Sequence, residues 1–130
     1  MEDILFYNEE HENYFYKFVK MFGDKLDEYR ITVAYLLSLD KVCRKHYEDI
    51  FDFEEQVIKP DGLRCAWQTG TSTRTTRLLF NLWNGYQSEG EPLEEEKPST
   101  NYTPEKIFSC GYAPYYWQAI KLRFPLYVEE

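Results

Sequence analysis

The stretch from Ile31 to Leu39, ITVAYLLSL, constrains the fold more than any other part of the chain, because Thr32 and Ser38 are its only non-apolar side chains. A helix with this sequence is apolar on nearly every side and must be surrounded by other elements. Adjacent β-branched residues leave a strand as the competing interpretation. The length of the segment and its acidic start favour a helix from Asp24 or Lys25 to about Leu39, at the centre of the protein.

Four further helices are expected around this centre. The first is capped by Asn8, ends at Gly23 and repeats apolar residues at helical spacing: His11, Phe15, Phe18 and Phe22. Asp40 caps a helix over residues 41–51, and another runs from Thr71 or Ser72 to Asn84. A short turn begins at Pro104. The last helix covers 114–124, with a core face of Trp117, Ile120 and Phe124.

The expected fold class is therefore mainly α, with about five helices in one compact domain over residues 1–130. Pro60-Asp61-Gly62 is a turn sequence, and its flanks at 55–59 and 63–69 read as short strands. A short β-hairpin around residues 54–69 would make the fold α+β. Residues 87–103, rich in Glu and Pro, are expected to form an acidic surface loop.

The charge balance limits the partners. The formal net charge is -8, so a basic groove for nucleic acid over the whole surface is not expected. The opening residues, MEDILFYNEE, lack the positive segment of a secretion signal, and ITVAYLL is too short to span a bilayer. With three widely spaced cysteines, the chain reads as a reduced cytoplasmic protein with no membrane partner.

Few residue types suited to catalysis are present. His11 and His46 are the only histidines, and both fall on the apolar side of an expected helix. Cys43 lies three residues before His46, but no zinc, P-loop, dinucleotide or nucleophile-elbow motif completes a site. We expect no metal, no cofactor and no catalytic residue. An enzyme that uses His11 or His46 is the least favoured alternative.

The segment GTSTRTTR, from Gly70 to Arg77, allows two interpretations. It could be a plain helix start with a Ser or Thr cap. It could also bind an anion, because no acidic residue occurs from Gly62 to Ser88 and helix starts attract negative charge. The candidate anion-binding residues are Gly70, Thr71, Ser72 and Arg74.

Two surfaces are candidates for docking a protein partner. Arg and Trp contribute strongly at interfaces, and this favours a patch of Arg64, Trp67, Arg74 and Arg77. Carboxylates on rigid structure could instead imitate a phosphate backbone, although a solvated face is the simpler interpretation. The first acidic set is Glu48, Asp49, Asp52, Glu54 and Glu55, and the second is Glu89, Glu91, Glu94, Glu95 and Glu96.

Several motifs resemble those of one uncharacterised family, known only as a domain of unknown function, from low-GC Gram-positive bacteria, their phages and conjugative elements. They are Glu10-His11, FDF at Phe51–Phe53, WQTGTS at Trp67–Ser72, RLLFNLWNG at Arg77–Gly85 and YYWQAIKLRFP at Tyr115–Pro125. The resemblance transfers no activity and no catalytic residue. It implies a mobile-element setting, in which small acidic proteins often block host machinery.

The sequence thus leads to a functional expectation: a small acidic, non-enzymatic protein that binds and inhibits a host protein complex. The partner would be a nuclease or another complex with a nucleic-acid channel, such as a CRISPR nuclease, and direct nucleic-acid binding is not expected. The alternative is a small anion- or nucleotide-binding module that uses the helix start at Gly70–Ser72 with Arg74 and Arg77.

Overall fold

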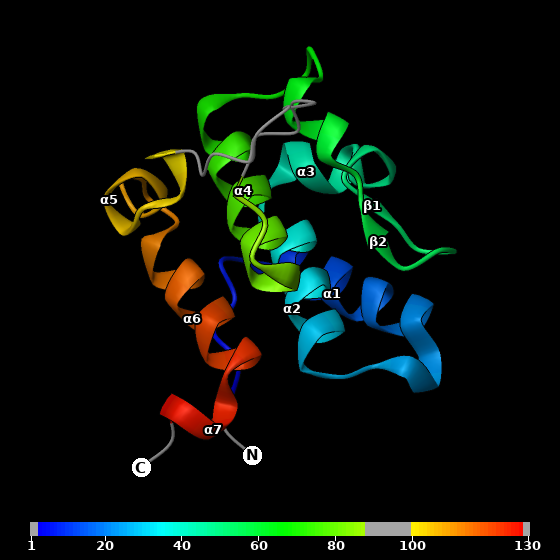
Figure 1. The fold of residues 1–130 in the computed structure, drawn as a ribbon. Coiled ribbons are helices and arrows are strands. Elements are labelled where there is room, and N and C mark those ends of the chain that lie inside the picture. The colour runs from blue at the N-terminus through cyan, green and yellow to red at the C-terminus, as the bar shows by residue number, and fades with distance from the viewer. Residues whose placement is uncertain (1–2, 88–99, 129–130) are drawn as a thin grey trace.

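A computed structural model describes residues 3–87 and 100–128. Helix α2 (Glu28–Leu39) lies at its centre and contacts α1 (Glu9–Phe22), α4 (Gly70–Asn84) and α6 (Ala113–Arg123) (Figure 1). Every residue from Thr32 to Leu39 is buried. The prediction of a central, fully surrounded helix is confirmed. It starts later than expected because Asp27 is the cap, its Oδ1 accepting the Arg30 N–H, while Gly23–Lys25 form the separate 3-10 turn η1.

Helix α1 begins and ends where the sequence indicates. The Asn8 side chain accepts the His11 N–H, and the four residues of the apolar repeat are buried. The segment before it is tied to two other helices through Leu5. The Leu5 N–H donates to Oε1 of Gln118 in α6, 113 residues along the chain, and the Leu5 carbonyl accepts the Tyr35 hydroxyl in α2.

The chain after α2 is less helical than predicted. Helix α3 covers only Lys41–Lys45 and is followed by η2 (Tyr47–Asp49), β1 (Phe51–Asp52) and β2 (Val57–Ile58). The two strands pair antiparallel, with Phe51 opposite Ile58 and Asp52 opposite Val57. The Asp52 carboxylate accepts the N–H groups of Glu54 and Glu55, and this interaction stabilises the turn between the strands.

A hairpin is therefore present, but it pairs 51–52 with 57–58, and the predicted partner strand at 63–69 is wrong. Pro60–Arg64 form the 3-10 turn η3, which packs against η2. A Cβ at Gly62 would lie 2.4 Å from the Asp49 carbonyl oxygen. Only glycine permits this close approach of the two backbones, which takes the segment away from the sheet.

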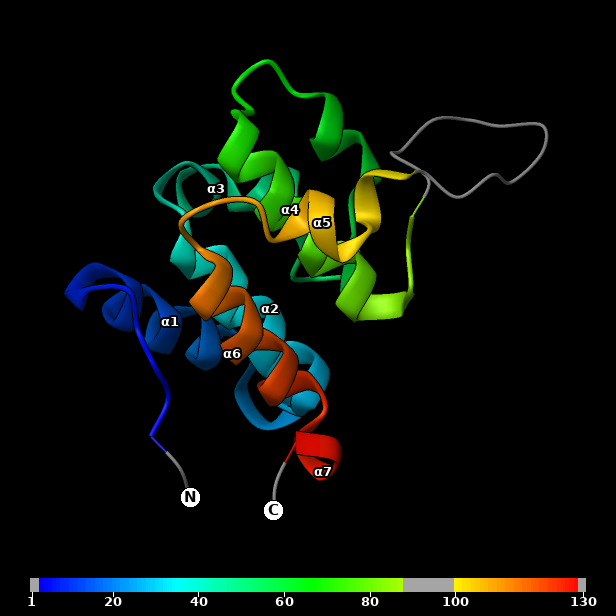
Figure 2. The same ribbon diagram turned by 90° about the vertical axis from the view of Figure 1, so that its left-hand side faces the viewer.

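Helix α4 has Thr69 as its cap and ends at Gly85, whose φ is 80°. After it come η4 (Thr100–Tyr102), α5 (Pro104–Ile107), α6 and α7 (Pro125–Val128). Figure 2 shows α6 lying across α2, with α5 beside α4. Of the predicted loop 87–103, residues 88–99 and the second acidic set lie outside the described part of the chain.

The predicted core face of α6 is wrong at Trp117, which is 49% exposed, whereas Tyr116 and Ala119 are buried. The Tyr116 hydroxyl forms a 2.7 Å hydrogen bond with Oγ1 of Thr75 in α4. This buried contact turns Tyr116 inward and so leaves its neighbour Trp117 on the surface. Within residues 3–87 and 100–128, no helix is both long and apolar enough to cross a bilayer.

Candidate functional site

An acidic pocket of about 380 Å³ lies between the end of α1, η2 and the hairpin. Its lining residues are Met21, Tyr47, Glu48, Phe51, Asp52, Phe53, Glu54 and Lys59. Three of them carry carboxylates and three carry aromatic rings. The Lys59 ammonium donates a 2.8 Å hydrogen bond to the backbone carbonyl of Glu48. The pocket therefore combines negative charge with ring surface.

Packing against the core holds the walls of the acidic pocket in place. The ring of Phe53 stacks on Phe22 and on Phe18, with centroids 4.7 Å and 5.8 Å apart. Phe51 is buried beside them. Phe18 and Phe22 belong to α1, and Phe53 follows strand β1 in the hairpin, so the stacked rings hold the hairpin against α1. The carboxylates of the pocket are therefore held in fixed positions.

Three of the five carboxylates in the first predicted acidic set line this pocket, namely Glu48, Asp52 and Glu54. Asp49 and Glu55 do not. The Asp49 carboxylate instead accepts a 3.0 Å hydrogen bond from the Trp67 indole N–H. The sequence places the five charges in one region, and the structure brings three of them to the pocket and one, Asp49, to Trp67.

A cationic pocket of about 400 Å³ lies where the start of α4 meets α5 and η4. Its lining residues are Thr69, Gly70, Thr73, Arg74, Arg77, Asn101 and Lys106. Three of these side chains are cations, and none of the seven is a carboxylate. This pocket therefore has the opposite charge to the acidic one.

Arg74 is held in the cationic pocket by two backbone carbonyls. Its Nε donates to the Lys106 carbonyl at 3.1 Å, and its Nη1 donates to the Gly70 carbonyl at 3.3 Å. Both acceptors are neutral. The guanidinium is fixed in place, and none of the four ion pairs among the described residues neutralises it.

The hydroxyl groups at the start of α4 are used within the protein. Thr69 and Ser72 form a capping box, in which each side chain accepts the other residue's backbone N–H. The Ser72 hydroxyl also donates to Oε1 of Gln68, and Ser72 is fully buried. Of the predicted anion-binding residues, Gly70 and Arg74 line the pocket, whereas Thr71 and Ser72 do not.

The four residues predicted as one docking patch divide into two pairs. Arg74 and Arg77 line the cationic pocket. Arg64 pairs with Asp61 in η3, and the Trp67 ring stacks on His46 at a centroid distance of 4.5 Å. The Arg64 and Trp67 pair thus belongs to the region around η2 and η3.

His11 is a structural histidine. Its Nδ1 accepts the Tyr7 N–H at 3.0 Å, and its Nε2 lies 3.0 Å from the Tyr35 carbonyl. These partners require a neutral ring with the proton on Nε2. The pKa of His11 is lowered from 6.5 to about 4, mainly by burial and in smaller part by the positive charge of Arg44, while the hydrogen bond with the Tyr35 carbonyl opposes this change. Both nitrogens are occupied, so the ring has none left for a substrate.

Cys43 is fully buried, and its Sγ contacts the Ser72 carbonyl and Oγ1 of Thr76. Burial raises the pKa of this thiol, which opposes formation of a reactive thiolate. Among the residues that the structure describes, no group of three or more His, Cys, Asp or Glu side chains is arranged to hold a metal ion.

The fold, the two charged pockets and the internal roles of His11 and Cys43 can now be compared with known proteins. A model of the family described as "Family of unknown function (DUF6075)" matches residues 1–130. The chain belongs to the DUF6075 family. No curated protein and no solved structure matches it.

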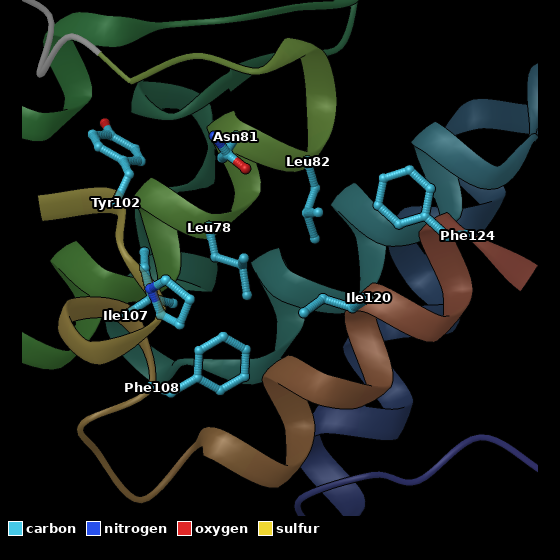
Figure 3. A pocket seen from close by; sticks show the side chains of 9 residues that line it. Leu78, Asn81, Leu82, Tyr102, Ile107, Phe108, Ile120 and Phe124 are labelled. Atoms are coloured by element: carbon cyan, nitrogen blue, oxygen red, sulfur yellow. The ribbon is translucent and has the colours of Figure 1, made fainter. Parts of the chain in front are cut away.

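In this DUF6075 chain a third, apolar pocket of about 200 Å³ lies between α4, α5 and α6. Figure 3 shows Leu78, Ile107, Phe108 and Ile120 pointing into the space between these helices. Asn81 also lines it, and its Nδ2 donates to the Tyr86 carbonyl. No charged side chain lines the pocket, so it suits a small apolar group.

Sequence reasoning missed several of the pocket residues of this DUF6075 member. Lys106 lies 32 residues after Arg74 in the chain, and no local pattern links the two. Asn101 falls in the predicted loop. For the acidic pocket the sequence does carry a signal, because FDF at Phe51–Phe53 alternates rings with a carboxylate.

Proposed function

We propose that the protein acts by binding a protein partner and that the acidic pocket receives a basic side chain or segment of that partner. The observation that supports this best is the combination, within one pocket, of the carboxylates of Glu48, Asp52 and Glu54 with the partly exposed rings of Tyr47 and Phe53. Lys59 is the one cation among the lining residues, and it bonds to a backbone carbonyl.

Such a pocket suits a guanidinium or an ammonium group. A carboxylate forms charge-assisted hydrogen bonds with arginine, and an aromatic ring attracts a cation to its face. The net charge of -8 adds a field that steers basic partners toward the protein. The fixed frame of rings reduces the entropy lost when the partner binds.

The finer proposal concerns the identity of the partner. Basic channels that hold nucleic acid occur in nucleases, and a rigid row of carboxylates can occupy such a channel. We propose that the partner is a host complex of this kind, for example a CRISPR nuclease, and that the protein inhibits it from a mobile element without catalysis. The resemblance to proteins of phages and conjugative elements supports this setting.

The docking proposal is tested with a short arginine-rich peptide, titrated into the protein and followed by calorimetry. We compare the wild type with a Glu48→Gln, Glu54→Gln double variant. Both residues are exposed, so the fold is retained. Glu12→Gln with Glu105→Gln is the matched control, because it changes the net charge equally at exposed positions outside the pocket.

The pocket variant is expected to weaken binding about tenfold or more, and the control by less than about threefold, because charges that contact the ligand contribute more than distant, screened ones. Equal weakening by both variants would mean that net charge alone attracts the peptide, and the pocket proposal would be rejected.

The inhibitor proposal has a separate test. The protein is used as bait in a host extract, a nuclease that it retains is purified, and the cleavage of DNA by this nuclease is measured with and without the protein. The wild type should reduce cleavage and the pocket double variant should not. A nuclease that remains fully active with the wild type present contradicts this proposal.

A further inference from the structure

The cationic pocket has no part in the docking proposal, because it is built from α4, α5 and η4 and shares no lining residue with the acidic pocket. We propose that it binds a phosphorylated small molecule, with Arg74 as the central contact and Arg77 and Lys106 beside it. This proposal does not depend on the proposed function.

The charge around the pocket is the first argument. In a protein with a net charge of -8, three cationic side chains line one concave site whose lining includes no carboxylate. The chain supplies no acidic residue from Gly62 to Ser88. Concave sites lined by charge of one sign concentrate the field, so this pocket is a local attractor for anions on an acidic surface.

The way in which Arg74 is held is the second argument. A guanidinium carries five N–H donors, and two of those of Arg74 bond to the Gly70 and Lys106 carbonyls. The fixed side chain keeps donors for an anion that lies in the pocket, and it retains its full charge because carbonyls are neutral. An arginine positioned before the ligand arrives loses less entropy on binding than a mobile one.

The size of the pocket selects the ligand class. A volume of about 400 Å³ falls within the range of about 300–1,000 Å³ that is typical of small-molecule sites. It exceeds what a single phosphate needs, and its lining contains more than one cation, as two linked phosphoryl groups require. Thr69, Thr73 and Asn101 complete the lining with neutral side chains, and the Thr73 hydroxyl donates to the Thr69 carbonyl. These features favour pyrophosphate or a nucleoside diphosphate over inorganic phosphate.

The test is a calorimetric titration of the full chain at low salt with inorganic phosphate, pyrophosphate and ADP as separate probes. We expect saturable binding of pyrophosphate and ADP with Kd below about 1 mM, and binding of phosphate about tenfold weaker because it carries less charge. Added salt should weaken all three. Absence of saturable binding for every probe would overturn the proposal.

Variants locate the site. Arg74→Gln should weaken pyrophosphate binding about tenfold or more, and Lys106→Gln, at an exposed position, gives the same direction if the first variant disturbs the fold. Arg64→Gln is the matched control, because Arg64 pairs with Asp61 outside the pocket, and it should leave the affinity within about twofold. Equal losses for Arg64→Gln and Arg74→Gln would refute the site.

The same variants separate this proposal from the docking proposal. The Glu48→Gln, Glu54→Gln variant should keep its pyrophosphate affinity, and Arg74→Gln should keep its affinity for the arginine-rich peptide. Tight binding of a single-stranded oligonucleotide together with no binding of pyrophosphate or ADP would replace the small molecule with a nucleic acid and overturn the ligand class proposed here.

Discussion

The two histidines lie in different surroundings, His11 inside the core and His46 at the surface. Around His11, both ring nitrogens bond to backbone groups inside the core, and the side chain is fully buried. Around His46, the side chain is 30% exposed, stacks on Trp67 with planes 6° apart and has its Nδ1 4.0 Å from the Asp49 carboxylate. The sequence placed both on the apolar side of a helix.

The difference shows that helical spacing alone does not decide how a histidine is used. His11 lies in α1, opposite the buried part of α2, where its ring accepts the Tyr7 N–H and donates to the Tyr35 carbonyl. His46 follows the end of α3, and the neighbouring turns η2 and η3 leave it at the surface. Substitutions around His11 should therefore lower the free energy of unfolding strongly, whereas substitutions around His46 should lower it little.

Replacement of His11 by Ala should have the largest effect. It leaves the Tyr7 N–H without its acceptor, removes one of the donors to the Tyr35 carbonyl and opens a cavity. We therefore expect a loss of about 3–5 kcal/mol in the free energy of unfolding. Urea denaturation measures this, with His46→Ala as the control at less than about 1 kcal/mol. Equal losses at the two positions would remove the contrast between the regions.

The stability of the wild type should fall as the pH drops from about 6.5 to about 4. The folded pKa of His11 is lowered to about 4, so in this window the unfolded state binds more protons and acid favours unfolding. At about 1.4 kcal/mol for each tenfold change in proton affinity, the loss approaches about 3 kcal/mol.

Two variants show which histidine causes this pH dependence. His11→Gln should flatten the slope of stability against pH between 4 and 6.5, whereas His46→Gln should keep it. Apart from the replaced histidine, the three proteins carry the same titratable groups, so a difference in slope is due to that histidine. A His11→Gln slope that matches the wild type would contradict the neutral, buried state of the ring.

Gly62→Ala tests the region around His46 through the close backbone contact between η3 and η2. An added Cβ would lie 2.4 Å from the Asp49 carbonyl oxygen, so the backbone of η2 or η3 must shift. We expect a loss of about 2 kcal/mol in the free energy of unfolding, and a change in the indole N–H resonance of Trp67. Gly111→Ala, where a Cβ meets nothing within 4 Å, is the control.

Asp49→Asn should have the smallest effect. It keeps an acceptor for the Trp67 N–H but removes the charge near His46, and pairs at exposed positions contribute about 0.2–1 kcal/mol. Thermal unfolding is sensitive enough to detect the change. A loss above about 2 kcal/mol would show that this region is as tightly coupled to stability as the His11 region.

The parts of the fold that the sequence predicts well are set by local signals. Asn8 caps α1, Gly85 ends α4, and the apolar run of α2 requires burial from all sides. The parts it does not predict depend on contacts between distant segments. Gly62 draws η3 onto η2 and away from the hairpin, and Tyr116 turns inward to bond with Thr75, which leaves Trp117 outside.

The candidate sites also divide into features set by local sequence and features set by contacts between distant segments. The carboxylates of the acidic pocket were visible because they are close together in the chain. The cationic pocket was predicted only in part, from Gly70, Arg74 and Arg77, because Lys106 reaches it through the packing of α5 against α4. Its shape arises from three elements, and no single stretch of sequence encodes it.

The double attachment of Leu5 also affects the order of events when the chain is made. The Leu5 N–H bonds to Gln118, which is added to the chain 113 residues later. Ribosomes add about 5–20 residues per second. For several seconds after α1 and α2 have emerged, Leu5 can therefore bond only to Tyr35. Its docking is completed when α6 leaves the ribosome, which makes it one of the last steps of folding.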